Sequence, residues 1–185
     1  MRDAPLLMRF EMAQATLCAN KTETRRIGEP KYEVGQLLWV REPWRTTSDF
    51  DHLPPRDIPH HALINYESTP SALTGGTWGR YRHARFMPRR LSRMTLLIDR
   101  VVKESLWSIT DYECECEGVM RIGKSEYAVM LNGIILHRGI NPWQCFGALW
   151  DSINGEGSWE ENPTVTAYKF KTYIVNIDKW RKAHA

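Results

Sequence analysis

Three segments carry the clearest periodic patterns in the chain. Residues 94–106, MTLLIDRVVKESL, and 162–177, NPTVTAYKFKTYIVNI, are rich in apolar and β-branched residues, which is typical of strands. Between them, NPWQCFGALWDSING has apolar residues at helical spacing, and Asn141 followed by Pro142 supplies a helix start. Strands and helices that mix along a chain in this way favour an α+β fold, here a small curved sheet or barrel with helices on its flanks.

Weaker signals complete the expected order of elements. We predict a first strand from residue 5, a helix over 10–20 that ends at Asn20, and a helix over 108–118 that is capped by Ser108 or Thr110 and ends at Gly118. The remaining segments are expected to be strands at 21–27, 34–44 and 61–68, loops at 45–61 and 68–79, an ambiguous strand-like region at 121–140, and a polar tail at 178–185.

The composition limits the class of protein. The chain has 185 residues, of which 42% are hydrophobic, so one domain with a real core is expected. Neither an apolar run of about 18 residues nor a signal peptide is found, which favours a cytoplasmic protein that does not bind membranes. The four cysteines lack the paired spacing of a zinc site, so we expect no metal and no cofactor.

Charge is distributed unevenly although the net charge is only +3. Residues 80–93, RYRHARFMPRRLSR, hold six arginines and no acid, and we call them the arginine-rich segment. Residues 111–117, DYECECE, hold four acids and no base. Local fields of this kind steer charged ligands, and a nucleic acid or nucleotide is the partner that arginines and neighbouring aromatic rings favour.

The run ANKTETRRIG, residues 19–28, concentrates cations and hydroxyls near the N-terminus. On a strand, Thr22, Thr24 and Arg26 would share one face, and Lys21, Glu23 and Arg25 the other. The run is consistent with a solvated surface or with the wall of a binding pocket.

The order of motifs resembles that of the ASCH domain superfamily, in particular its bacteriophage-type members. The resemblance rests on KTETRR after a short helix, VGQLLWVRE, MPRRLSRMTL, SITDYECECEGV, FGALWDSINGEGSWEENP and a final strand ending YKF. It covers nearly the whole chain, and residues 45–79 and 121–140 are expected to be loop insertions in a single domain over 1–185. Such proteins are similar to PUA domains, so the resemblance implies a small PUA-like β-barrel with flanking helices and a cleft for RNA or a nucleotide.

One branch of that superfamily hydrolyses the N4-acyl amide of N4-acetylcytidine with a Lys and a Thr of a K-T-x-T motif and a Glu from a later helix. The resemblance therefore implies Lys21, Thr24 and Glu117 as catalytic residues, with Glu113 as the fallback for the glutamate, and it leaves open which of Glu113, Glu115 and Glu117 faces the cleft. The expected ligand-binding residues are Thr22, Arg25, Arg26, Arg82, Arg85, Arg89, Arg90 and Arg93.

The chemistry of an amidohydrolase gives these residues roles. Thr24 would attack the acyl carbon, a desolvated Lys21 would act as base or would stabilise the oxyanion, and Glu117 would protonate the departing amine. In a regular strand, Lys21 and Thr24 lie on opposite faces, so this mechanism requires a bend between them.

The sequence is consistent with several other functions. The protein can be an RNA-binding module without catalysis, in which the arginines contact phosphates. It can be a phage protein that binds a host protein through residues 45–79 in the host cytoplasm, or a ribonuclease that uses Lys and Glu to drive attack by a 2′-hydroxyl. In the alternative without a ligand, the arginine-rich segment is a surface loop whose arginines pair with the acidic helix at 111–117.

Overall fold

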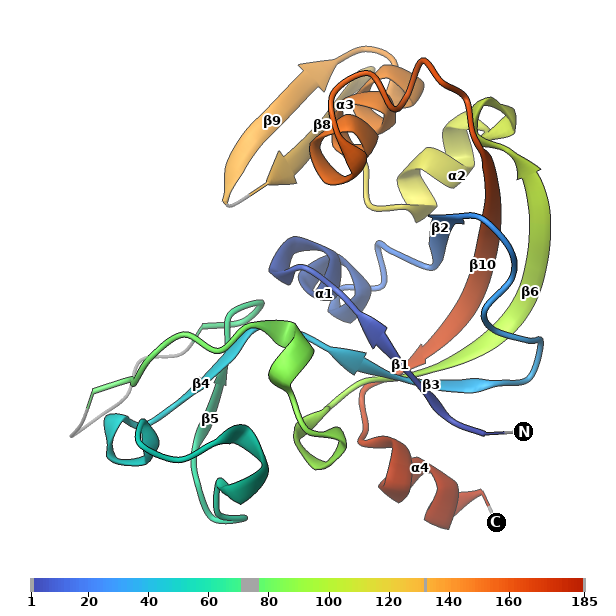
Figure 1. Ribbon diagram of the computed structural model, residues 1–185. Coiled ribbons are helices and arrows are strands. Elements are labelled where there is room, and N and C mark those ends of the chain that lie inside the picture. The colour runs from blue at the N-terminus through green and yellow to red at the C-terminus, as the bar shows by residue number, and fades with distance from the viewer. Residues whose placement is uncertain (1, 71–76, 132, 185) are drawn as a thin grey trace. The chain divides into compact units, whose positions relative to one another are not determined.

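The computed structural model describes residues 2–70, 77–131 and 133–184, and it confirms the α+β class (Figure 1). The strands are β1 (Ala4–Leu7), β2 (Glu23–Ile27), β3 (Leu37–Arg41), β4 (Trp44–Thr46), β5 (Ile64–Tyr66), β6 (Thr95–Ser105), β7 (Met120–Gly123), β8 (Glu126–Leu131), β9 (Ile134–Gly139) and β10 (Thr164–Tyr173). The α-helices are α1 (Phe10–Leu17), α2 (Asp111–Cys116), α3 (Pro142–Asn154) and α4 (Ile177–Ala183). Short 3₁₀ turns are η1 (Ser48–Phe50), η2 (Pro55–Asp57), η3 (Ala84–Phe86), η4 (Arg89–Leu91) and η5 (Leu106–Ser108).

The described strands form three sheets, and no closed barrel is found among them. Five strands are hydrogen-bonded in the order β1-β3-β6-β10-β2, two in the order β4-β5, and three in the order β7-β8-β9. Contacts group the chain into two compact units: unit 1 holds residues 1–14, 37–96 and 173–185, and unit 2 holds residues 15–36 and 97–172. The expected insertion at 45–79 lies in unit 1, and the one at 121–140 lies in unit 2.

In unit 1, β1 pairs in parallel with β3, and β4 pairs antiparallel with β5 (Figure 1). A small core forms where Trp44, Ile58 and Met87 are almost completely buried. Burying large apolar side chains contributes about 1.5–3 kcal/mol each, so residues 45–61 are held by a core of their own rather than forming only a loop.

The prediction of a polar tail after residue 177 is wrong, because α4 begins there. The Asn176 side chain accepts a hydrogen bond from the backbone N–H of Asp178, which caps the helix. Ile177 is completely buried and anchors the first turn. A seven-residue helix with one buried apolar residue leaves almost no periodic signal, which explains the miss.

In unit 2, β10 pairs antiparallel with β2, and α3 packs against β8 and β9 (Figure 1). The ambiguous region 121–140 is the β7-β8-β9 sheet with its turn at Gly133, which has a φ of 74°. Glycine adopts that left-handed conformation without strain. Of the apolar residues that the helical spacing places on one face of α3, Phe146, Leu149 and Trp150 are buried, whereas Ile153 at the end of the helix is 37% exposed.

Helix α1, which precedes the KTETRR run, ends close to its predicted position, and α2 begins close to its predicted position. α1 ends at Leu17, and the left-handed residue that reverses the chain is Ala19, with a φ of 59°, rather than Asn20. Of the two predicted caps of α2, Thr110 is the one used, because its hydroxyl accepts from the N–H of Glu113 while the Glu113 carboxylate accepts from the N–H of Thr110.

No α-helix within residues 2–70, 77–131 and 133–184 has the length and apolar character needed to cross a bilayer.

Candidate functional site

Lys21 and Glu117 meet in unit 2, although 96 residues separate them in the sequence. The Lys21 ammonium Nζ lies 2.6 Å from Glu117 Oε2 and 2.8 Å from the Glu117 carbonyl oxygen, and it donates a hydrogen bond to each. Both residues are buried, with only 3% and 4% of their surface exposed. An ion pair removed from water in this way is rare in a solvated surface strand, where charged side chains stay exposed.

Backbone contacts fix the two residues in place. Lys21 and Glu117 form an isolated antiparallel bridge, and the N–H of Thr22 donates to the carbonyl of Cys116 at 2.9 Å. On the other side, the N–H of Lys21 donates to the carbonyl of Ala15 on α1 at 3.0 Å. The end of α2 is thereby attached to the chain between α1 and β2, so the pair is built by main-chain geometry as well as by charge.

Arg25 adds a second cation to the same buried region. Its guanidinium lies 2.9 Å from Glu104, 3.3 Å from Glu113, 3.3 Å from Glu117 and 3.5 Å from Glu23. Only 4% of Arg25 is exposed. We call Glu23, Glu104, Glu113 and Glu117 the carboxylate cluster, and Arg25 is the cation at its centre. The four carboxylates of the protein therefore occupy the guanidinium of Arg25, which was predicted to bind a ligand.

Burial and charge shift the pKa values of the pair. Burial lowers the pKa of Lys21 below its ordinary value, even though the adjacent Glu117 carboxylate acts in the opposite direction. Burial alone would raise the pKa of Glu117, but the charges of Lys21 and Arg25 outweigh it and hold that pKa below the ordinary value. Lys21 is therefore easier to deprotonate than a surface lysine, while Glu117 stays ionised at neutral pH.

The pKa values of Arg25 and Glu23 are also shifted from their ordinary values. Burial opposes the charge of Arg25, but four surrounding carboxylates raise its pKa above the ordinary value, so it remains charged. Burial raises the pKa of Glu23, and the like charges of Glu113 and Glu117 add to that effect. Glu23 is thus easier to protonate than an exposed glutamate.

Thr24 lies on the other face of β2 from Arg25. In the β2–β10 ladder, Thr24 is opposite Tyr168, whereas Glu23 is opposite Lys169 and forms an ion pair with it at 3.7 Å. The alternation predicted for residues 22–26 is confirmed in this respect. Thr24 is 5% exposed, and in the described part of the chain its hydroxyl makes no hydrogen bond with Lys21 or Glu117. The structure brings two of the three predicted catalytic residues, Lys21 and Glu117, into contact, and Thr24 is instead opposite Tyr168 in the ladder.

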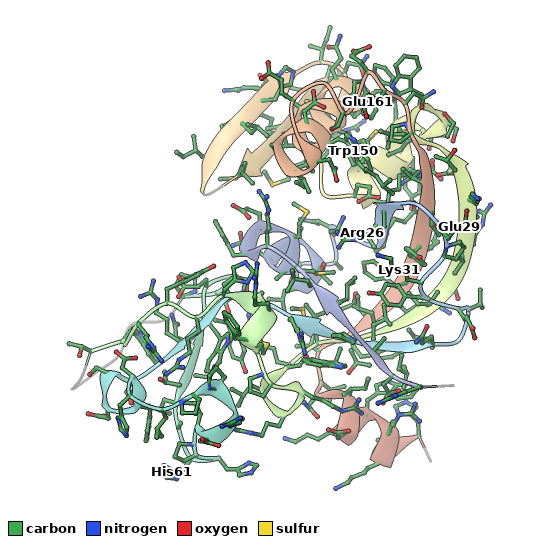
Figure 2. All side chains as sticks on the ribbon, viewed as in Figure 1. Arg26, Glu29, Lys31, His61, Trp150 and Glu161 are labelled. Carbon is green, nitrogen blue, oxygen red and sulfur yellow. The ribbon has the colours of Figure 1, made fainter. Side chains whose placement is uncertain are left out.

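Arg26 and Thr22 flank this arrangement. Arg26 follows Arg25 on β2, opposite Thr166, and is partly exposed (Figure 2). Its charge is one of the factors that lower the pKa of Lys21. The carbonyl of Thr22 accepts a hydrogen bond from the N–H of Phe170, so Thr22 links β10 to the Lys21 segment.

A polar depression that the sequence did not indicate lies on the Arg25 side of unit 2. It is lined by Glu23, Arg100, Val102, Glu104, Glu113, Ala167 and Lys169. Arg100 and Lys169 come from β6 and β10, which were recognised as strands but not as sources of charge near the KTETRR run. The alternation of polar residues along both strands was the available signal, but strand pairing was needed to connect it with Glu23.

Most of the predicted arginines outside this region have contacts within unit 1. Arg89 binds Asp178 at 2.6 Å and Asp3 at 2.6 Å. Arg93 binds the completely buried Glu42 at 2.9 Å. These two guanidinium groups hold the start of the chain and α4 to the arginine-rich segment, which is a structural use of their charge.

Arg82 and Arg90 bind main-chain carbonyls instead. Arg82 is buried and donates to the carbonyls of Phe50 and Leu53 at 2.9 and 3.1 Å, and Arg90 donates to the carbonyl of Ile58. Arg85 differs, because it is exposed and in the described part of the chain no carboxylate pairs with it. Within segment 111–117, Glu113 pairs with Arg25, and Glu117 pairs with both Arg25 and Lys21.

Among residues 2–70, 77–131 and 133–184, no group of three or more His, Cys, Asp or Glu side chains is arranged to hold a metal ion. Comparisons of the chain with protein-family models, with curated proteins and with solved structures found no match.

Proposed function

We propose that the protein hydrolyses the N4-acyl amide of an acylated cytidine, as a free nucleoside or within RNA, on a PUA-like fold of the ASCH type. The observation that carries the proposal is the 2.6 Å contact between Lys21 Nζ and Glu117 Oε2 in a site that excludes most solvent. A buried lysine whose pKa is lowered by burial, next to an ionised carboxylate, is a pair of groups suited to accept and return a proton.

The reaction consumes one water and moves two protons. An oxygen nucleophile forms a bond to the acyl carbon and gives its proton to the Lys21–Glu117 pair. The bond between the acyl carbon and N4 then breaks, and the pair returns a proton to N4, so that cytidine and a carboxylic acid are released. The ammonium form of Lys21 stabilises the oxyanion that develops on the acyl oxygen.

The nucleophile is the hydroxyl of Thr24 in this proposal. Attack by Thr24 gives an acyl-threonine ester, and a water molecule then hydrolyses that ester to regenerate the hydroxyl. Thr24 is the threonine that the K-T-x-T resemblance implies, and it lies in unit 2 together with Lys21 and Glu117. In the competing route, a water attacks directly and the Thr24 hydroxyl is dispensable.

Incubation of the protein with N4-acetylcytidine is expected to release cytidine, measured by chromatography of the reaction mixture. Thr24→Ser keeps a hydroxyl and is expected to retain turnover, whereas Thr24→Val removes it with little change of shape and is expected to lose about 100-fold or more in rate. Equal rates for Thr24→Val and the wild type would assign the nucleophile to water. A wild type that releases no cytidine would remove the proposed function itself.

A further inference from the structure

An exposed set of basic and aromatic side chains lies in unit 1, outside the Lys21 region. In residues 80–87, the chain exposes most of its side chains while three, Arg82, Ala84 and Met87, are buried. We call the exposed members the aromatic–basic strip: Arg80, Tyr81, His83, Arg85 and Phe86. The rings are well exposed, because Tyr81 keeps 50% and Phe86 57% of its surface accessible.

The buried residues fix the backbone of the strip. Arg82 forms a bridge with Trp44 and is buried to 4% exposure. The N–H of Arg80 donates to both carboxylate oxygens of Asp51, at 2.9 and 3.0 Å. The His83 Nδ1 accepts a hydrogen bond from the N–H of Arg85 and caps η3. The displayed side chains therefore start from an ordered backbone, which lowers the entropy that a ligand must remove on binding.

The charges of the strip are available for a ligand. In the described part of the chain, no carboxylate lies within ion-pair distance of the guanidinium of Arg80 or Arg85. The neighbouring acids are engaged, because Asp51 accepts the Arg80 N–H and Glu67 binds Arg45 at 2.6 Å. By contrast, the guanidinium groups of Arg89, Arg90 and Arg93 bind carboxylates or a carbonyl inside unit 1.

The rings already lie close to cations. The Arg45 guanidinium lies 5.7 Å from the centre of the Tyr81 ring, and the Arg85 guanidinium lies 5.9 Å from the centre of the Phe86 ring. A ring with a guanidinium beside it matches a nucleotide, in which a flat base is joined through its sugar to a phosphate. An acidic peptide would use the charges but would leave both rings without a stacking partner.

We propose that the aromatic–basic strip binds single-stranded nucleic acid, with bases stacked on Tyr81 and Phe86 and phosphates held by Arg80 and Arg85. The strip lies wholly in unit 1, whereas Lys21 and Glu117 lie in unit 2, so this inference does not rest on the proposed hydrolysis. It replaces most of the arginines that the sequence suggested with residues whose side chains the structure leaves exposed.

Fluorescence anisotropy with a labelled oligouridylate of about ten nucleotides tests the proposal on the full chain. Tyr81→Ala and Phe86→Ala are each expected to weaken binding about five- to 150-fold, because one stacked base contributes about 1–3 kcal/mol. Arg85→Ala is expected to reduce the slope of log affinity against log salt by about 0.7, which corresponds to one lost phosphate contact on a single strand. An oligodeoxythymidylate of the same length decides whether the strip distinguishes RNA from DNA.

Matched controls are available at exposed positions outside the strip. Tyr112→Ala and Arg56→Ala, whose parent side chains are also exposed, are expected to bind like the wild type. All variants are checked by thermal unfolding. The proposal is overturned if the wild type does not bind either oligonucleotide, or if Tyr81→Ala and Phe86→Ala bind as tightly as the controls. Equal competition by poly-glutamate, with no effect of the ring substitutions, would likewise overturn it in favour of an acidic protein partner.

Discussion

Replacement of Arg25 by methionine is expected to reduce the free energy of unfolding by about 3–5 kcal/mol at neutral pH. Methionine fills a similar volume but leaves the carboxylate cluster without its central cation. Four glutamates that lie 2.9–3.5 Å from the guanidinium would then face one another with Lys21 as their nearest buried cation. The loss exceeds that of a surface ion pair because Arg25 is 4% exposed and solvent cannot replace it.

The loss of unfolding free energy caused by Arg25→Met is expected to become smaller as the pH falls. In the wild type, Lys21 and Arg25 hold the pKa of Glu117 below its ordinary value, so the stability from Glu117 is present above the unfolded pKa and is lost as the pH falls through the folded one. Without Arg25, the folded-state pKa values of the cluster rise, and the variant gains stability relative to the wild type as the pH falls. The difference between the two proteins is therefore expected to shrink between about pH 7 and pH 4.

Urea unfolding of both proteins across that pH range measures the difference. Arg138→Met is the matched control, because Arg138 forms an exposed pair with Glu126, and its replacement is expected to change stability little at any of these pH values. An Arg25→Met protein that is as stable as the wild type at pH 7, or a difference that grows as the pH falls, would contradict the description of the cluster.

The contact between Lys21 and Glu117 shows which parts of the candidate site can be predicted from the sequence and which cannot. The capping signal at Thr110 and the glycine at 118 place Glu117 at the end of a helix, and the alternation of the KTETRR run places Lys21 and Arg25 on one face. These local rules do not bring the two segments together. The backbone bridge between Lys21 and Glu117 and the ladder between β2 and β10 do so, and both are pairings across long stretches of chain.

In the arginine-rich segment, the sequence composition does not show which side chains face solvent. Its composition indicates a binding surface, but composition does not distinguish a guanidinium that faces solvent from one that binds Glu42 or a buried carbonyl. Arg82 is buried where its guanidinium donates to the carbonyls of Phe50 and Leu53, and Arg89 is engaged because α4, which the sequence did not reveal, supplies Asp178. Partners such as Asp3 and Asp178 lie more than 80 residues from Arg89, so no local pattern could have identified them.

Glu117→Gln is expected to lower the rate of N4-acetylcytidine hydrolysis by about 10²- to 10⁴-fold, the usual contribution of a positioned acid–base group. Glutamine keeps the shape of the side chain and can still accept a hydrogen bond from Lys21, but it cannot receive and return a proton. It also removes the charge that favours the ammonium form of Lys21, so the pKa of Lys21 should fall further below its ordinary value.

The kinetic comparison uses initial rates at saturating substrate and at a temperature where thermal unfolding shows each protein folded. Glu126→Gln, which neutralises an exposed glutamate paired with Arg138, is expected to retain the wild-type rate. If Glu117→Gln is folded and turns over substrate as fast as Glu126→Gln, then Glu117 has only a structural role and the acid–base assignment fails.

The most direct test of the central claim is the rate of cytidine release by Lys21→Met protein. Lys171→Met is the control, since Lys171 is exposed and pairs with Asp99 at 3.4 Å in the same unit. We expect that Lys171→Met hydrolyses N4-acetylcytidine like the wild type and that Lys21→Met, although folded, releases no cytidine above the uncatalysed background. Wild-type turnover by a folded Lys21→Met protein would contradict this expectation, because the buried lysine–glutamate pair would then take no part in the reaction.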